Sequence, residues 1–141
     1  MPNLIEDRLS ELLVTWMDQH RHADLPESLH ILMARRDEIR TRPCVVINTS
    51  EAKSIPALPH TARVKLDLHL FSQVDDTTAD LHATWAAALA SMLANFPQLS
   101  ADLNSATFFL HALQPKESTT TPDEARGRET ILSYEAVVSA V

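Results

Sequence analysis

The chain has 141 residues with 45% apolar side chains, and its 12 Lys and Arg against 19 Asp and Glu give a net charge of −7. This length and apolar share predict one domain over residues 1–141 and exclude intrinsic disorder for most of the chain. The single glycine, Gly127, excludes the dinucleotide-binding fingerprint, the phosphate-binding loop and the nucleophile elbow, each of which needs several glycines at fixed spacing.

The charge and the cysteine content exclude further classes of protein and site. An acid excess is the opposite of what most nucleic-acid binders carry. The single cysteine, Cys44, excludes an intrachain disulfide and a cysteine-based zinc site. The first residues lack the basic and apolar segments of a signal peptide, and no run approaches about 18 apolar residues. We therefore expect a cytoplasmic protein without a membrane partner.

The N-terminal third is predicted to be helical. Between residues 3 and 20 the apolar side chains recur with the period of an α-helix, and Asn3 with Glu6 has the spacing of a capping box. Pro26 suits the first turn of a second helix. That helix should end before Pro43, because the residue that precedes a proline resists the helical region.

The middle of the chain is predicted to form a hairpin. Residues 43–49 are a short β-rich run, and residues 49–60 are predicted as a loop because they lack periodicity and contain Pro56 and Pro59. Residues 62–74 alternate between apolar and polar side chains, which predicts a half-buried strand with one polar face and an exposed edge. The polar set is Arg63, Lys65, Asp67, His69 and Gln73.

The C-terminal half adds a helix and a second hairpin. Residues 75–78 supply capping and acidic side chains, and the helical period then runs to Phe96, where Pro97 ends it. The remaining segments are a short helical turn at 100–104, a strand at 105–113, a polar loop at 115–128 and a last strand at 129–138. The order α-α-β-β-α-β-β predicts an α+β fold, with a four-stranded, mainly antiparallel sheet of two hairpins and two to three helices packed on one face.

Clusters of reactive side chains have simpler roles, and none predicts a catalytic residue, a metal site or a cofactor. The histidines and aspartate at 20–24 mark a helix end, where His is electrostatically favoured. Asp76, Asp80 and His82 could hold a hydrolytic metal, but aspartates at a helix start are common caps. Cys44 lies in an apolar strand, where a buried thiol is inert.

The other features favour association over catalysis. The arginines at 35–42 alternate with acidic residues, which predicts a solvated ion-pair face. The strand at 62–74 exposes an edge, two long polar loops lie at hairpins, and the first helix carries Trp16 and Met17. Such features are typical of a protein that assembles with copies of itself or with partners.

Three runs resemble the tail-terminator family of long-tailed bacteriophages, which includes minor tail proteins of similar size. They are residues 42–47 (RPCVVI), the alternating strand that ends at residues 73–78 (QVDDTT) before a helix with His82, and residues 127–135 (GRETILSYE). The resemblance implies a structural virion protein of the tail and neck, assembled in the host cytoplasm. Six copies would form a ring that caps the tail tube and docks the head connector, while DNA passes through the channel unread.

The exposure pattern indicates which residues would meet these partners. Arg63, Lys65, Asp67 and His69 are expected at the subunit interface or the channel lumen, where an acidic or mixed surface lets DNA phosphates slide. The loops at 50–60 and 115–128 are expected to contact the tail tube protein or the connector. Their candidate residues are Glu51, Lys53, His60, Lys116, Glu117, Asp123 and Arg126. Gly127, where the second loop enters the last strand, is expected to adopt a positive φ.

Two other classes remain open. Type III secretion chaperones are also small, acidic α+β proteins that dimerise, but they usually close with a helix where this chain predicts a strand. A metal-dependent hydrolase would use Asp76, Asp80 and His82. A hexamer in solution favours the terminator, a stable dimer favours the chaperone, and a divalent metal that survives dialysis favours the hydrolase.

Overall fold

The computed structural model describes residues 5–34, 43–73, 77–124 and 127–140, with the backbone alone at 121–124. Its elements in chain order are α1 (Ile5–Gln19), β1 (His30–Met33), β2 (Cys44–Ser54), β3 (Thr61–Gln73), α2 (Ala79–Ala94), α3 (Phe96–Leu103), β4 (Phe108–Glu124) and β5 (Gly127–Ala140). The first predicted helix is confirmed as α1.

A fifth strand, β1, makes the sheet mixed. The strand order is β1-β2-β3-β5-β4, in which β1 runs parallel to β2 and all other neighbours are antiparallel. The prediction of a four-stranded, mainly antiparallel sheet with the order α-α-β-β-α-β-β is therefore wrong, because the observed order is α-β-β-β-α-α-β-β.

Strand β1 lies where a second helix was predicted. Pro26 begins a turn, in which the Leu29 N–H donates to the Pro26 carbonyl at 3.1 Å. The strand that follows pairs with residues 44–47 of β2. A short apolar run fits a strand as well as a helix, and the backbone partners that β2 offers decide between them. The rest of the predicted helix, residues 35–42, lies outside the described residues.

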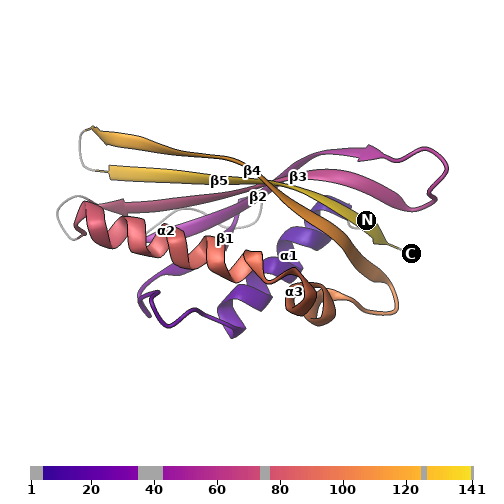
Figure 1. Ribbon diagram of the computed structural model, residues 1–141, viewed down its shortest axis with the longest axis horizontal. Helices are drawn as coiled ribbons and strands as arrows, with labels where there is room; N and C mark the ends of the chain where they lie inside the picture. Colours follow the sequence, from indigo (N-terminus) through magenta and orange to yellow (C-terminus); the bar gives the residue numbers. More distant parts are fainter. Residues whose placement is uncertain (1–4, 35–42, 74–76, 125–126, 141) are drawn as a thin grey trace.

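Two segments predicted as loops are largely strand. β2 continues to Ser54, and β4 with β5 takes up nearly all of residues 115–128. Hydrophobic patterning misses these segments because they carry few apolar side chains. Threonines such as those at 119–121 favour an extended backbone. The backbone hydrogen bonds between strands also form without a hydrophobic core beneath them. The β2–β3 and β4–β5 hairpins therefore extend to opposite ends of the molecule (Figure 1).

The three helices of the described residues cover the same face of the sheet (Figure 1). Between the two layers lies one hydrophobic core, whose fully buried side chains include Met17, Leu68, Leu89, Leu99 and Phe108. In the described part of the chain, no helix has the length and apolar content to cross a membrane.

The boundaries of α2 and α3 follow local capping chemistry. Thr78 is the N-cap of α2, and its Oγ1 accepts a hydrogen bond from the Leu81 N–H at 3.1 Å, as the sequence predicted. Pro97 lies in the first turn of α3, so the proline begins a helix rather than only ending one. The helical turn predicted at 100–104 is the second half of α3.

Gly127 does not adopt a positive φ, contrary to the prediction. Among the described residues, the left-handed region is occupied by Glu51 (φ 53°), Ala57 (φ 70°) and His60 (φ 60°). Glu51 lies where the register between β2 and β3 shifts, and the other two turn the hairpin loop. All three of these described residues carry a Cβ, so their left-handed backbone conformation has some energetic cost.

Candidate interaction surface

Strand β3 lies at the centre of the sheet and presents its charged side chains on the face opposite the helices. It pairs with β2 on one side and with β5 on the other, so the exposed edge predicted at 62–74 is wrong. The predicted alternation is confirmed, since the apolar side chains of this strand face the core. We define the open face by its charged and polar side chains Arg63, Lys65, Asp67, His69, Glu129, Ser133 and Glu135. The partly exposed side chains of Phe71, Ile131 and Val137 lie between them on the same side.

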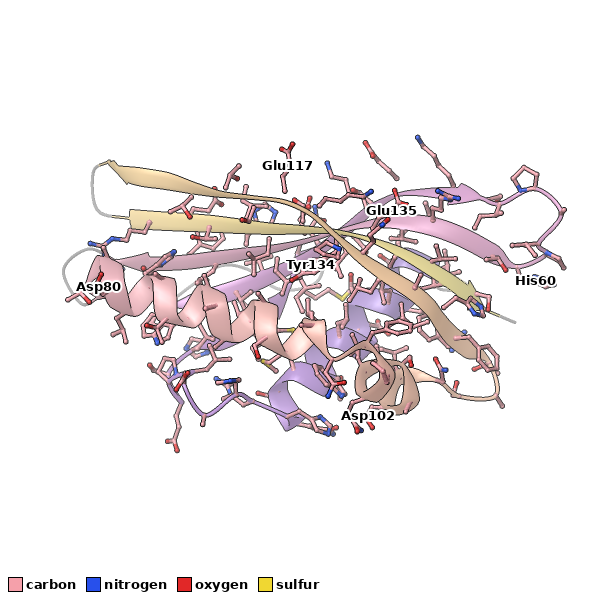
Figure 2. The ribbon with its side chains drawn as sticks, viewed as in Figure 1. His60, Asp80, Asp102, Glu117, Tyr134 and Glu135 are labelled. Carbon is pink, nitrogen blue, oxygen red and sulfur yellow. The ribbon has the colours of Figure 1, made fainter. Side chains whose placement is uncertain are left out.

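The open face is limited on its β2 side. Cys44 and Val46 alternate onto the same side of the sheet, yet their side chains are buried. The predicted burial of the Cys44 thiol is therefore confirmed. The charged part of the face is carried by β3 and β5, and Figure 2 shows Glu135 on this side, with Tyr134 on the side of the helices.

Two side-chain pairs, an Arg–Glu ion pair and a His–Glu hydrogen bond, cross between β3 and β5 on the open face. Arg63 Nη1 lies 3.5 Å from Glu135 Oε1, and His69 Nδ1 lies 3.4 Å from Glu129 Oε2. Both pairs are diagonal, because Lys65 lies directly opposite Glu135 in the register and Phe71 lies directly opposite Glu129. Pairs this accessible to water contribute little to stability, so they define the charge pattern of the surface more than they hold the fold.

Asp67 is a residue of the open face with an unsatisfied hydrogen-bond acceptor. Its Oδ1 is buried and has no hydrogen-bond partner among the described residues. In the register Asp67 lies between Asn48 of β2 and Ser133 of β5. An unsatisfied carboxylate oxygen is unfavourable in a buried position, so Asp67 is held here at a cost to stability.

A hollow of about 390 Å³, lined by residues of β2, β3, β4 and β5, lies beside these residues. Its basic lining consists of Arg63, Lys65, Lys53 and Lys116, and we call it the lysine groove. The last three are all the lysines of the chain. Glu51 and Glu135 line the same hollow. The sequence analysis placed Arg63 and Lys65 on a strand face, Glu51 and Lys53 in one loop and Lys116 in another. The structure brings these residues together around one hollow.

The other predicted contact residues lie elsewhere. His60 lines a larger hollow of about 980 Å³ between the β2–β3 loop and the start of α1, beside Leu58, which is 54% exposed. Glu117 is exposed, and Figure 2 shows it pointing away from the sheet on the side opposite the helices. The side chain of Asp123 and the whole of Arg126 lie outside the described residues.

The two edges of the sheet are poorly suited to adding another strand. β1 has only 4 residues, and the pairing of β4 with β5 shifts register at three places. β4 also contains Pro115 and Pro122, and the N–H of Leu110 is taken by Asn104 Oδ1 at 2.9 Å. Short edge strands, bulges and prolines hinder edge-to-edge pairing. Contacts between copies are therefore better served by the open face and the hairpins.

A buried polar network lies beneath α2, and the sequence interpretation did not foresee it. Ser72 Oγ is 2.6 Å from His82 Nδ1, His82 Nε2 is 2.8 Å from Thr130 Oγ1, and Thr120 Oγ1 is 3.0 Å from the same Thr130 oxygen. Ser72 is fully buried, which leaves its hydroxyl no open path to a substrate, so we interpret the network as structural. The signal was present, because Ser72 and Thr130 continue the core-facing alternation of β3 and β5 with polar residues.

The candidate metal clusters do not converge on a common point. His82 is buried and Asp80 is exposed, while Asp76 lies outside the described residues. His20 stacks on Trp16 with ring centroids 5.1 Å apart, whereas His22 Nδ1 accepts from the Asp24 N–H at 3.0 Å. Among the residues with described positions, no three His, Cys, Asp or Glu side chains are grouped as a metal ion needs. The arginines at 35–42 fall in a gap of the described ranges.

No protein-family model matches this chain, and a comparison with curated proteins gives no significant match.

Proposed function

We propose that the protein is a structural subunit of a bacteriophage virion, a tail terminator that forms a ring of six copies. The ring would cap the tail tube, join it to the head connector in the neck, and leave a channel through which DNA passes. The observation that carries this proposal is the open face, a charged sheet surface at the centre of the molecule that no described helix covers.

Two further observations support assembly through this face. Asp67 Oδ1 is buried without a donor among the described residues, and a contact with a neighbouring copy that reorients this carboxylate would relieve the cost. The edges of the sheet are blunted by the short β1 and by the prolines and bulges of β4. A ring joined through faces and hairpins uses two different surfaces of each copy. Such a ring closes when the rotation that relates one copy to the next is a whole fraction of a full turn.

The hairpins provide the contacts along the ring axis in this proposal. The β2–β3 loop projects at one end of the molecule and exposes Leu58, next to the hollow that His60 lines (Figure 2). Covering this apolar side chain with a partner would remove its surface from water, which favours a contact at this loop. We assign this end to the tail tube or the connector.

Native mass spectrometry and electron microscopy of the purified protein, alone and mixed with tail tube protein, test the proposal. We expect rings of six, or ring formation on the ends of tubes. The variant Asp67→Arg should prevent rings because it places a cation and extra volume on the open face, whereas Ala101→Arg on the exposed side of α3 should leave them intact. A stable dimer would instead favour the chaperone, and a monomer that ignores tube ends would contradict the proposal.

A further inference from the structure

The lysine groove gathers basic charge in a protein that is otherwise acidic. The chain carries a net charge of −7, yet all three of its lysines line one hollow of about 390 Å³ together with Arg63. These four cations outnumber the two carboxylates, Glu51 and Glu135, in the same lining. Like charges brought this close repel one another, so the arrangement favours an anionic occupant.

The lysines are available to such an occupant. Among the described residues, Lys53, Lys65 and Lys116 form no ion pair, and all three side chains are exposed. Lys65 lies directly opposite Glu135 in the register, but the Glu135 carboxylate contacts Arg63 instead, at 3.5 Å. The internal carboxylate therefore neutralises the arginine and leaves the ammonium groups to bind an external anion.

The mixed charge of the lining suits individual carboxylates of a protein surface better than the phosphate backbone of a nucleic acid. A nucleic-acid strand presents a continuous row of negative charges, and Glu51 and Glu135 would repel part of it. Side chains of a protein surface can instead place carboxylates beside the cations and donors beside the glutamates. In the ring proposed above, DNA must also slide through the channel, and four cations in the lumen would hold its phosphates.

A surface of this kind exists on the opposite side of the same molecule. Asp18 of α1 and Glu27 line a hollow of about 380 Å³ beside β1, and Asp24 is exposed nearby in the chain. The Asp18 and Asp24 side chains are 66% and 61% exposed. Arg21 Nη2, from the same lining, lies 2.8 Å from Asp18 Oδ1, and His22 Nδ1 lies 3.8 Å from Asp24 Oδ2. The three carboxylates still outnumber the Arg21 guanidinium, so the surface keeps an excess of negative charge. We call Asp18, Asp24 and Glu27 the acidic corner. Because α1 covers the face of the sheet opposite the lysine groove, one molecule cannot join the two surfaces, but two copies can.

We propose that the lysine groove of one copy binds the acidic corner of the next copy. This inference rests on the proposed function, since it names the charge contact that joins neighbours in the ring. It assigns Arg63 and Lys65 to the subunit interface rather than to the lumen. Contacts of this type act mainly on the rate and specificity of association and weaken with salt.

Charge variants of the full chain test the contact. The triple change Lys53→Gln, Lys65→Gln and Lys116→Gln should raise the protein concentration needed for half assembly by roughly tenfold or more, and added salt should act in the same direction. The matched change of all three lysines to Arg keeps the charge and should leave assembly intact. A second control, Ser91→Glu, Ala94→Glu and Ala101→Glu, alters the net charge equally on exposed helix positions and should also be silent.

Carbodiimide coupling identifies the partner side chains directly. It joins an amine to a carboxylate already in contact, and a mixture of normal and isotopically heavy protein separates links between copies from links within one. We expect mixed-isotope links from the groove lysines to Asp18, Asp24 or Glu27. Reversal of the lysines to Glu should abolish assembly, and adding Asp24→Lys and Glu27→Lys to the same chain should restore it.

Each contrary result has a distinct meaning. Rings that persist in the triple Gln variant, without mixed-isotope links, overturn this inference and leave the terminator proposal standing. A dimer held by the expected links keeps the inference and overturns the ring. A wild-type chain that never associates contradicts both. Retention of a labelled DNA duplex that is lost in the Gln variant, with assembly unchanged, assigns the groove to nucleic acid instead.

Discussion

Ser72 and His82 are joined by a hydrogen bond of 2.6 Å between Oγ and Nδ1, which ties the end of β3 to the first turn of α2. The other ring nitrogen of His82 lies 2.8 Å from Thr130 Oγ1 on β5. A neutral imidazole has one donor and one acceptor nitrogen, so hydroxyl groups can satisfy both. One buried side chain thus fastens α2 to two neighbouring strands.

Loss of this imidazole should destabilise the fold. His82→Ala removes the partner of two buried hydroxyls and leaves a cavity, so we expect the free energy of unfolding to fall by about 2–4 kcal/mol. Urea denaturation measures the change. His111→Ala is the matched control, because His111 is exposed and contacts one hydroxyl, Ser139 Oγ at 2.8 Å, and it should change the value by less than about 0.5 kcal/mol. Equal effects of the two variants would contradict the role of the network.

The contact between α1 and α3 should make stability depend on pH. The Trp16 Nε1–H donates to Asp102 Oδ2 at 2.9 Å and is the main cause that lowers the pKa of Asp102 below its ordinary value of 3.8, followed by the hydrogen bond from Gln98. A lowered pKa in the folded state stabilises the protein above the ordinary pKa, and this stabilisation is lost as the pH falls through the folded value.

The isosteric change Asp102→Asn isolates that effect. We expect the variant to be less stable than the wild type at neutral pH, with the difference shrinking as the pH is lowered through the range below about 4. Trp16→Phe removes the donor and should weaken the same pH dependence. Urea unfolding at a series of pH values measures the difference, and a gap that stays constant down to the acid limit would refute the assignment.

Ala57 occupies the left-handed region with φ 70° in the loop between β2 and β3. Ala57→Gly relieves the Cβ clash, which is worth about 1–2 kcal/mol, but adds entropy to the unfolded chain. We expect a net gain of about 0.5 kcal/mol in unfolding free energy. Ala52 lies within β2 and does not have a positive φ, so Ala52→Gly should instead lower the unfolding free energy by about 0.5–1 kcal/mol. Thermal and urea denaturation compare the pair, and a loss in both would contradict the strain at Ala57.

Leu58 at the tip of the β2–β3 loop should matter for partners and not for folding. Its side chain is 54% exposed, so Leu58→Ser should change the unfolding free energy by less than about 0.5 kcal/mol while weakening attachment to tail tubes or the connector. Leu81→Ser on α2 is the control, because Leu81 is also exposed, at 41%, but lies on a helix. Co-sedimentation with tubes measures attachment, and equal attachment by both variants would remove the loop from the contact surface.

The candidate surface could be predicted only in part. The alternation of residues 62–74 identified Arg63, Lys65, Asp67 and His69 as one face, because side chains of a strand alternate strictly between two sides. The lysine groove could not be found this way. Lys53, Lys65 and Lys116 lie on three strands, and only the registers of β2 with β3, β3 with β5 and β5 with β4 bring them together.

The sequence by itself determined the elements whose signals are local. The helical period predicted α1, the same period with the Thr78 cap predicted α2, and the two-residue period predicted the faces of β3, since each signal depends on neighbours within a few residues. The capping box predicted at Asn3 lies outside the described residues. Only the tertiary structure decided that residues 30–33 form a parallel strand, that the polar segments 49–54 and 115–124 are paired, and that β3 is central. Those outcomes depend on backbone hydrogen bonds to distant partners, and such bonds leave no mark in the hydrophobic pattern of one segment.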